Sequence, residues 1–208
     1  MTCVERGGGV AYSILRRILN RGATSDVVGP MPHHRTQPSV TALHEAAHCA
    51  AHKFLLGHAP ETATILRDAD AGSLGHVQPS DGWDDEPSAR AAVIASLAGL
   101  AAELHIGVPT AHAHGSAEGD LASAREILEQ LGEAARLEEH VARACAFVAE
   151  RWDVIVLLAR DLDVYSTLAW EEIDMRLDGC DDASMARMRT LLRRPSADAN
   201  EGSRPDLG

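Results

Sequence analysis

The sequence is poor in aromatic residues and in positive charge. Aromatic residues make up 3% of the 208 residues, so the core must be built mainly from alanine, leucine, valine and isoleucine. Against 31 aspartates and glutamates there are 19 lysines and arginines, which gives a formal net charge of −12 at pH 7. Because phosphates and anionic lipids attract basic surfaces, this charge argues against nucleic acid or an anionic membrane as a partner.

Long apolar segments and closely spaced cysteines are also missing. The most apolar stretch, residues 154–159, is far shorter than the ~18 residues that a membrane span needs. The first residues, MTCVERGGGV, lack the basic and apolar regions of a secretory signal. The four cysteines are scattered and form no CxxC pair: Cys3, Cys49, Cys145 and Cys180. We therefore expect a cytoplasmic protein without a membrane span.

Composition divides the chain into three regions. Residues 1–38 contain stretches rich in glycine and proline and are interpreted as an N-terminal extension or linker. Residues 39–180 carry the hydrophobic patterns of one folded domain. Residues 181–208 predict a short helix over 184–194, followed by a disordered tail.

Helical patterns dominate the central region. A first helix is predicted over residues 40–56, with Ser39 or Thr41 as its N-cap and Gly57 at its end. Residues 62–78 predict two short strands around a turn. Further helices are expected over residues 88–106, 116–132, 133–162 and 170–177. The predicted fold class is α+β and predominantly helical, with a small β-hairpin and a C-terminal helical bundle.

The first helix contains the motif His44-Glu45-Ala46-Ala47-His48, an HExxH pattern. Residues four apart lie on the same face of a helix, so both imidazoles can bind one Zn²⁺ ion. The intervening Glu45 can act as a general base that takes a proton from the attacking water and passes it to the leaving amine. The motif therefore predicts a zincin-like helix with a catalytic zinc ion.

Spacing alone does not identify the third ligand that a catalytic zinc site needs. The metzincin pattern would place it ten residues after His44, but Phe54 occupies that position. His52 lies a further turn along the helix axis, which is too far to share one tetrahedral ion easily. The remaining candidates are Glu61, Asp81, Asp84, Glu103, His105, His112, His114 and Asp120.

Five segments, in the same order, resemble the peptidase part of FtsH-type ATP-dependent zinc metalloproteases. Residues 41–57 (TALHEAAHCAAHKFLLG) resemble the zinc helix of the family, whose motif is HEAGH. Residues 62–81 are similar to its "TI-P-RG-ALG" strand pair, and residues 97–103 (LAGLAAE) to its "LGGRAAEE" helix. Residues 116–124 (SAEGDLASA) resemble "GASNDLxxAT", and residues 157–173 are similar to the family's last helical segment.

This resemblance implies a complete catalytic site. The aspartate of the family's "DL" step is its third zinc ligand and matches Asp120, so the expected ligands are His44, His48 and Asp120. Without the resemblance, Asp120 would be read as a helix N-terminal charge. Glu103 matches a family glutamate, which either orients a zinc-binding histidine or forms a salt bridge within the domain.

The resemblance also implies how a substrate binds. Residues 71–76 (AGSLGH) match a strand beside which an extended peptide can pair, and glycines there permit close backbone approach. The predicted substrate-binding residues are Gly72, Ser73, Leu74 and Gly75. The family forms hexamers, so a homo-oligomer is expected.

The chain departs from the family in lacking an ATPase motif. A P-loop, GxxxxGK[ST], requires a lysine, and the only lysine is Lys53 on the zinc helix. We therefore expect either a separate ATPase that unfolds substrates or substrates that are already unfolded. The predicted function is a zinc metalloendopeptidase that hydrolyses internal peptide bonds of unfolded or flexible proteins. The alternatives are a non-proteolytic, zinc-stabilised interaction module and a zinc hydrolase acting on a non-protein amide.

Overall fold

The computed structural model describes residues 37–66, 76–78 and 85–192. The described helices are α2 (Val40–Ala51), α3 (Glu86–His105), α4 (Thr110–Ser116), α5 (Glu118–Gln130), α6 (Leu137–Tyr165), α7 (Trp170–Leu177) and α8 (Asp182–Leu192). Two short helical turns, η1 (His52–Leu56) and η2 (Ala134–Arg136), and three strands, β1 (Thr62–Thr64), β2 (His76–Gln78) and β3 (Thr167–Ala169), complete the described elements. The prediction of a predominantly helical α+β fold is confirmed.

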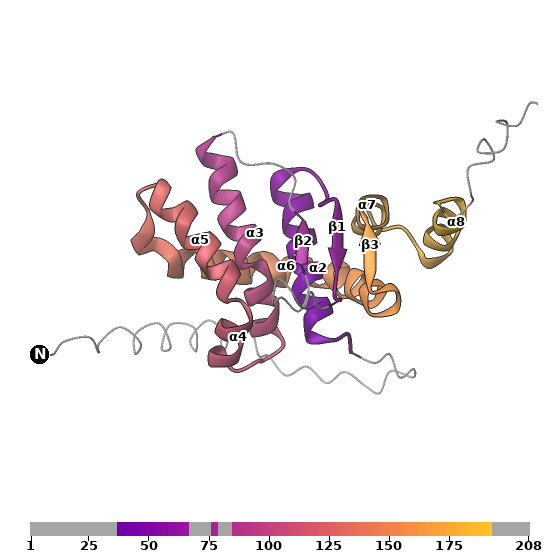
Figure 1. Cartoon of the computed structure of the whole chain (residues 1–208), viewed down its shortest axis with the longest axis horizontal. Coiled ribbons are helices and arrows are strands. Elements are labelled where there is room, and N and C mark those ends of the chain that lie inside the picture. The colour runs from indigo at the N-terminus through magenta and orange to yellow at the C-terminus, as the bar shows by residue number, and fades with distance from the viewer. Residues whose placement is uncertain (1–36, 67–75, 79–84, 193–208) are drawn as a thin grey trace, which may run out of the picture.

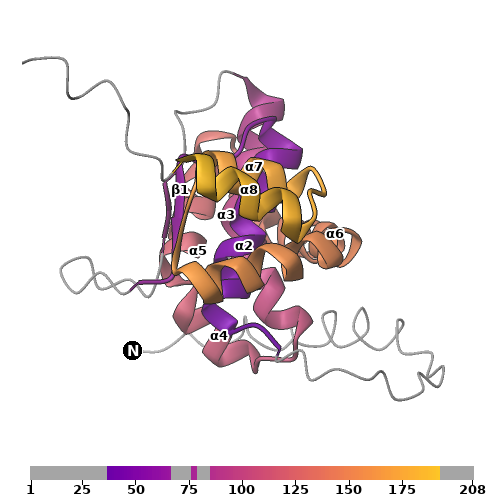
Figure 2. The same ribbon diagram turned by 90° about the vertical axis from the view of Figure 1, so that its right-hand side faces the viewer.

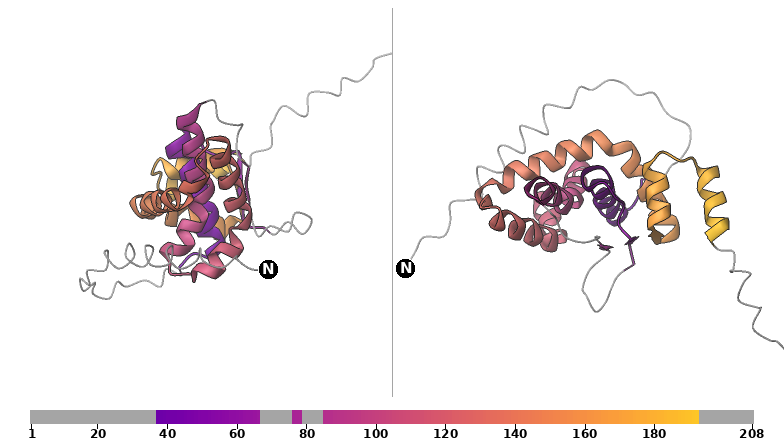
Figure 3. Two further views of the ribbon diagram at one scale, coloured as in Figure 1. Left: turned by 90° about the vertical axis from the view of Figure 1, so that its left-hand side faces the viewer. Right: turned by 90° about the horizontal axis from the view of Figure 1, so that it is seen from above.

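Helices α2 and α3 lie at the centre of the molecule (Figure 1). Both pack against the long helix α6, which runs along one side of them when the molecule is seen from above (Figure 3). Helix α5 packs against α3, and strands β1 and β2 contact α2. The core is built from alanine and leucine, among them Leu43 on α2, Leu97 and Leu100 on α3, and Leu158 on α6, all fully buried. The low aromatic content therefore leads to helices that pack closely through small side chains.

Helix α2 begins where the sequence predicts. The Ser39 hydroxyl accepts a hydrogen bond from the backbone N–H of Ala42 at 3.1 Å, so Ser39 is the N-cap. Asp163 on α6 accepts hydrogen bonds from the Ser39 hydroxyl at 2.6 Å and from its N–H at 2.8 Å. The predicted helix over residues 40–56 changes after Ala51 into a π-helical turn, η1, and Gly57 ends it with φ +87°.

The strands form an antiparallel sheet in the order β2-β1-β3. Strand β1 pairs with β2 through Ala63 opposite Val77, as expected for the predicted hairpin. It also pairs with β3 through Ala63 opposite Leu168. The third strand was not predicted, because three residues of mixed polarity before a helix carry no strand pattern of their own.

Several predicted helix boundaries were wrong by a few residues. Helix α3 begins at Glu86 rather than at residue 88, because Asp85 and Ser88 form a capping box in which the Asp85 carboxylate accepts from the Ser88 N–H at 2.8 Å. The helix predicted over residues 116–132 corresponds to α5, which begins at Glu118, and the short helix α4 that precedes it was not predicted. In the described part of the chain, no helix is both long and apolar enough to cross a membrane.

Charged contacts hold the C-terminal helices α7 and α8, seen side by side in Figure 2, to α6. Asp161 on α6 accepts from the Arg176 guanidinium at 2.5 and 3.1 Å, and both side chains are buried. Arg189 on α8 donates to Glu172 at 2.7 Å and stacks on the Tyr165 ring, with 3.7 Å from the guanidinium carbon to the ring centroid.

A further contact connects α7 to the end of the first helix. The Lys53 ammonium on η1 forms ion pairs with Asp174 and, at 3.2 Å, with Asp178. The contact fixes the turn at which the HExxH helix ends to the C-terminal part of the domain.

Candidate metal centre

Two helices bring His44, His48 and Asp120 to one point. The HExxH spacing places both histidines on one face of α2, and Asp120 comes from the first turn of α5. The Nε2 atoms of His44 and His48 are 3.1 Å apart, and the Oδ2 atom of Asp120 lies 3.0 Å from the first and 3.3 Å from the second. These three residues could hold a metal ion.

The triangle formed by these three atoms has the size required by a tetrahedrally coordinated ion. Zinc binds imidazole nitrogen and carboxylate oxygen at about 2.0–2.2 Å, so two ligand atoms of one tetrahedron lie about 3.3 Å apart. The distances of 3.0, 3.1 and 3.3 Å fall close to this value. If these three residues held a zinc ion, they would be three protein ligands, the number found in catalytic zinc sites, whereas structural sites use four.

Hydrogen bonds on the far side of each ring engage Nδ1, so that Nε2 is the nitrogen that faces Asp120. His48 Nδ1 lies 2.7 Å from the backbone carbonyl oxygen of Ala95, which can only accept, so Nδ1 carries the proton. His44 Nδ1 lies 2.8 Å from Oε1 of Glu103. A neutral imidazole that donates from Nδ1 is a metal ligand through Nε2, which is how histidines are oriented in metal sites.

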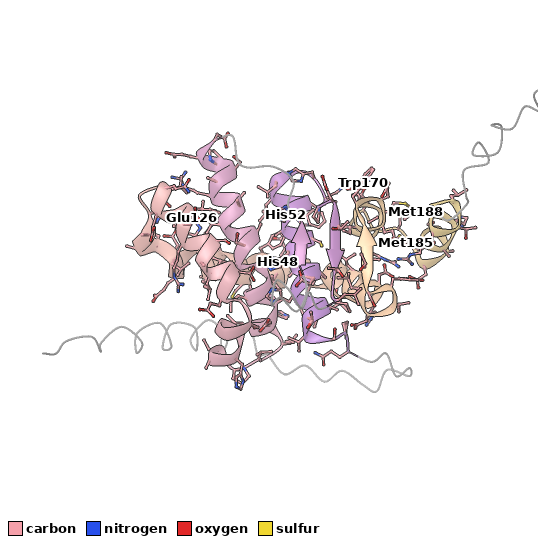
Figure 4. The ribbon with its side chains drawn as sticks, in the orientation of Figure 1. His48, His52, Glu126, Trp170, Met185 and Met188 are labelled. Carbon is pink, nitrogen blue, oxygen red and sulfur yellow. The ribbon has the colours of Figure 1, made fainter. Side chains whose placement is uncertain are left out.

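Helix α3 approaches His44 so closely that only glycine fits at one position. A Cβ atom on Gly99 would lie 2.4 Å from Nε2 of His44, closer than real side-chain contacts. The backbone of α3 therefore supports the face of the imidazole. Figure 4 labels His48 on α2 and His52 at the start of η1, near the middle of the molecule.

Carboxylates make the cluster attractive to a cation. Burial lowers the pKa of His44, but hydrogen bonds to Asp120 and Glu103, together with the charges of Asp120 and Glu45, outweigh this effect and raise the pKa to about 10. Burial of His48 also lowers its pKa, and the charge of Asp120 reverses the effect and raises it. Burial raises the pKa of Asp120, whereas the two histidines lower it well below its usual range. The negative electrostatic potential that favours protonated histidines here also favours a divalent cation.

Glu45 is buried beside the two histidines, with 5% of its surface exposed. Its negative charge contributes to the raised pKa of both His44 and His48, so the carboxylate lies within electrostatic reach of the cluster. The structure thus places the predicted base on the same buried helix as two of the predicted ligands, next to the point where all three ligands meet.

The other candidate ligands do not join this group. Within the described residues, the group that could hold a metal ion consists of His44, His48 and Asp120. His105 packs its ring on Trp152 at 4.3 Å between centroids, and His52 is half-buried with a pKa lowered to about 4 by burial and by the charges of His48 and His58. Several predicted positions lie outside the described residues or side chains: Gly72, Ser73, Leu74, Gly75, Asp81, Asp84 and His114.

Three contacts of the site were not predicted from the sequence. They are the Ala95 carbonyl oxygen, the close approach of Gly99 and a hydrogen bond from Ser116 to Glu103. A glycine within an alanine-rich buried helix was a signal for close packing, because glycine destabilises a helix interior unless space requires it. A backbone carbonyl carries no sequence signal at all.

Comparison with known proteins gave no relative: no protein-family model matches this chain, and no curated protein does.

Proposed function

We propose that the protein is a zinc metalloendopeptidase, with His44, His48 and Asp120 as metal ligands and Glu45 as general base. The observation that carries the proposal is the 3.0–3.3 Å triangle of two imidazole nitrogens and one carboxylate oxygen beside a buried glutamate. A two-histidine, one-carboxylate set is an ordinary ligand set for catalytic zinc.

Each residue has a distinct part in the proposed hydrolysis. A Zn²⁺ ion held by His44, His48 and Asp120 would supply Lewis acidity towards water and the scissile carbonyl. Glu45 accepts a proton from the attacking water on its carboxylate and delivers it to the leaving amine nitrogen. Glu103 and the Ala95 carbonyl hold the two rings in an orientation in which Nε2 would bind the ion.

The substrate class follows from the chemistry and from the resemblance to FtsH-type peptidases. We propose unfolded or flexible polypeptides as substrates, because extended chains can present a peptide bond to a metal without prior unfolding. A separate ATPase would be needed only for folded substrates, and a homo-oligomer is part of the same proposal.

The test compares wild type with Glu45→Gln in cleavage of casein without ATP, while bound zinc is measured in both. We expect about one zinc per chain in both proteins and a loss of at least about 100-fold in cleavage for the variant. Glu61→Gln, which changes an exposed carboxylate after η1, is the matched control and should cleave like wild type.

Two results would contradict the proposal. If the purified protein contained no stoichiometric zinc, the assignment of a metal site would be wrong. Zinc-loaded wild type that cleaves no unfolded protein would favour a zinc-stabilised interaction module in place of a peptidase.

A further inference from the structure

Ser116, the last residue of α4, contacts a residue that orients the proposed metal ligand His44. Its hydroxyl oxygen lies 2.8 and 2.7 Å from the two carboxylate oxygens of Glu103. It also lies 3.2 and 3.1 Å from the carbonyl oxygens of His112 and Ala113. A hydroxyl has one proton, and a charged acceptor at shorter distance makes the stronger hydrogen bond, so Ser116 donates to Glu103.

Glu103 therefore joins two parts of the metal centre that are far apart in the sequence. On one side its Oε1 atom accepts from Nδ1 of His44 on α2 at 2.8 Å. On the other it accepts from Ser116, four residues before Asp120. Backbone hydrogen bonds continue across this step, from the Ala117 N–H to Ala113 at 3.1 Å and from the Leu121 N–H to Ala117 at 2.9 Å.

One buried carboxylate thus ties the histidine helix to the junction of α4 and α5 that carries the third ligand. The side chain of Glu103 is almost fully buried, with 3% of the residue exposed, so its position is set by α3. Ser116 itself is exposed. Water could replace its hydroxyl as a donor, but water would not hold α4 to α3.

We propose that Ser116 is a positioning residue that fixes Asp120 relative to His44 through Glu103, and so sets the affinity of the site for a divalent cation. The inference rests on the proposed metal centre. It assigns Ser116 no contact with the ion or with a substrate.

The test measures Zn²⁺ affinity by competition with a chelator and the visible absorption spectrum of the Co²⁺-loaded protein. Ser116→Ala should weaken Zn²⁺ binding about three- to tenfold, the effect of one lost hydrogen bond, and should change the Co²⁺ spectrum. Ser116→Thr keeps the hydroxyl and should restore both. Ser184→Ala is the control, because that hydroxyl accepts from Arg187 on α8 at 2.8 Å, away from the centre.

A double variant tests whether Ser116 acts through Glu103. Glu103→Gln should weaken zinc binding about 10- to 100-fold, and adding Ser116→Ala should then cost nothing more. The inference would be overturned if Ser116→Ala bound zinc with native affinity, or if it weakened zinc binding equally with Glu103 and with Gln at position 103. In either case, zinc binding by the wild type would still support the metal centre. A wild-type protein that binds no zinc would overturn the metal centre and this inference together.

Discussion

Glu103 on α3 and Asp161 on α6 are both buried carboxylates on long helices, but their partners differ. Asp161 is bound by Arg176, and Arg189 lies 3.7 Å away, so its partners carry permanent charge. Among the described residues, Glu103 and Asp120 form their ion pairs with histidines alone.

The difference separates a structural cluster from one that can bind a ligand. A guanidinium group does not lose its proton at any ordinary pH. The charge of Asp161 is therefore neutralised by its arginine partners once the chain folds. An imidazole can release its proton and bind a metal ion instead. The histidines on α2 can therefore hold either protons or a metal cation. The contrast is testable by changing each region in turn.

The largest expected effect on folding comes from Asp161→Ala. The substitution leaves the Arg176 guanidinium buried without its main partner and should lower the free energy of unfolding by about 3–5 kcal/mol. Denaturant unfolding measures the loss, and zinc affinity of the folded protein should stay unchanged.

Asp182→Ala is the matched control for this change. Asp182 binds the same guanidinium at 3.0 Å, but its side chain is 94% exposed. Its loss should cost at most about 1 kcal/mol. Equal losses for Asp161 and Asp182 would mean that burial does not distinguish the two carboxylates.

Zinc binding is the main readout for Asp120→Ala. Loss of one of three proposed ligands should weaken zinc binding by more than the ~100-fold that a lost outer contact can cost. Glu118→Ala changes an exposed acid two residues earlier on α5 and should bind zinc like wild type. Zinc affinity that survives in Asp120→Ala would place the third ligand elsewhere.

Gly99→Ala tests the support of the His44 ring without changing a ligand. Because the added methyl group would lie 2.4 Å from Nε2, the ring must move, and zinc binding should weaken about 10- to 100-fold. Gly115→Ala is the control on α4, where an added Cβ meets nothing within 4 Å. Gly115→Ala should keep zinc binding and stabilise the helix by about 0.5–1 kcal/mol. Native affinity in Gly99→Ala would show that the ring tolerates displacement.

The smallest effect concerns a histidine outside both clusters. Burial lowers the pKa of His140 on α6, so it is neutral in the folded protein and takes up a proton more readily when unfolded. Its neutral form therefore favours folding above the unfolded pKa of about 6.5, and this contribution is lost as the pH falls. The slope should be at most about 1.4 kcal/mol per pH unit.

His140→Leu should flatten this part of the stability profile between pH 7 and pH 5, measured by denaturant unfolding. His44, whose pKa is raised to about 10 in the metal-free protein, contributes with the opposite sign: its protonated form favours folding below about pH 6.5, and this contribution is lost as the pH rises towards 10. An unchanged profile in His140→Leu would assign the acid sensitivity to another group.

The sequence predicted the parts of the molecule that depend on regular spacing. HExxH on a capped helix was sufficient to place His44, Glu45 and His48, because a helix has a fixed period. Asp120 required the resemblance to a family, since it lies 72 residues after His48 and spacing gave eight equal candidates. Its position at the cluster agrees with that assignment.

The missed features depend on contacts between distant segments. Helix α4 has glycine and three polar histidine or serine positions in seven residues, so it shows no apolar stripe, and it forms where α3 and α5 pack on it. Strand β3 exists through pairing with β1, about 100 residues earlier in the chain. Such pairing has no local pattern before the fold is known.

Lys53 gives the molecule a built-in chemical reporter, because it is the only lysine in the sequence. A hydrogen bond to Asp174 on α7 raises the pKa of its ammonium group, and 20% of the side chain is exposed. Amine-reactive labels attack the uncharged amine, so labelling of Lys53 should be slow while α7 stays docked and faster when it detaches. The labelling rate of a single side chain thus reports whether the end of the HExxH helix remains attached to the C-terminal helices.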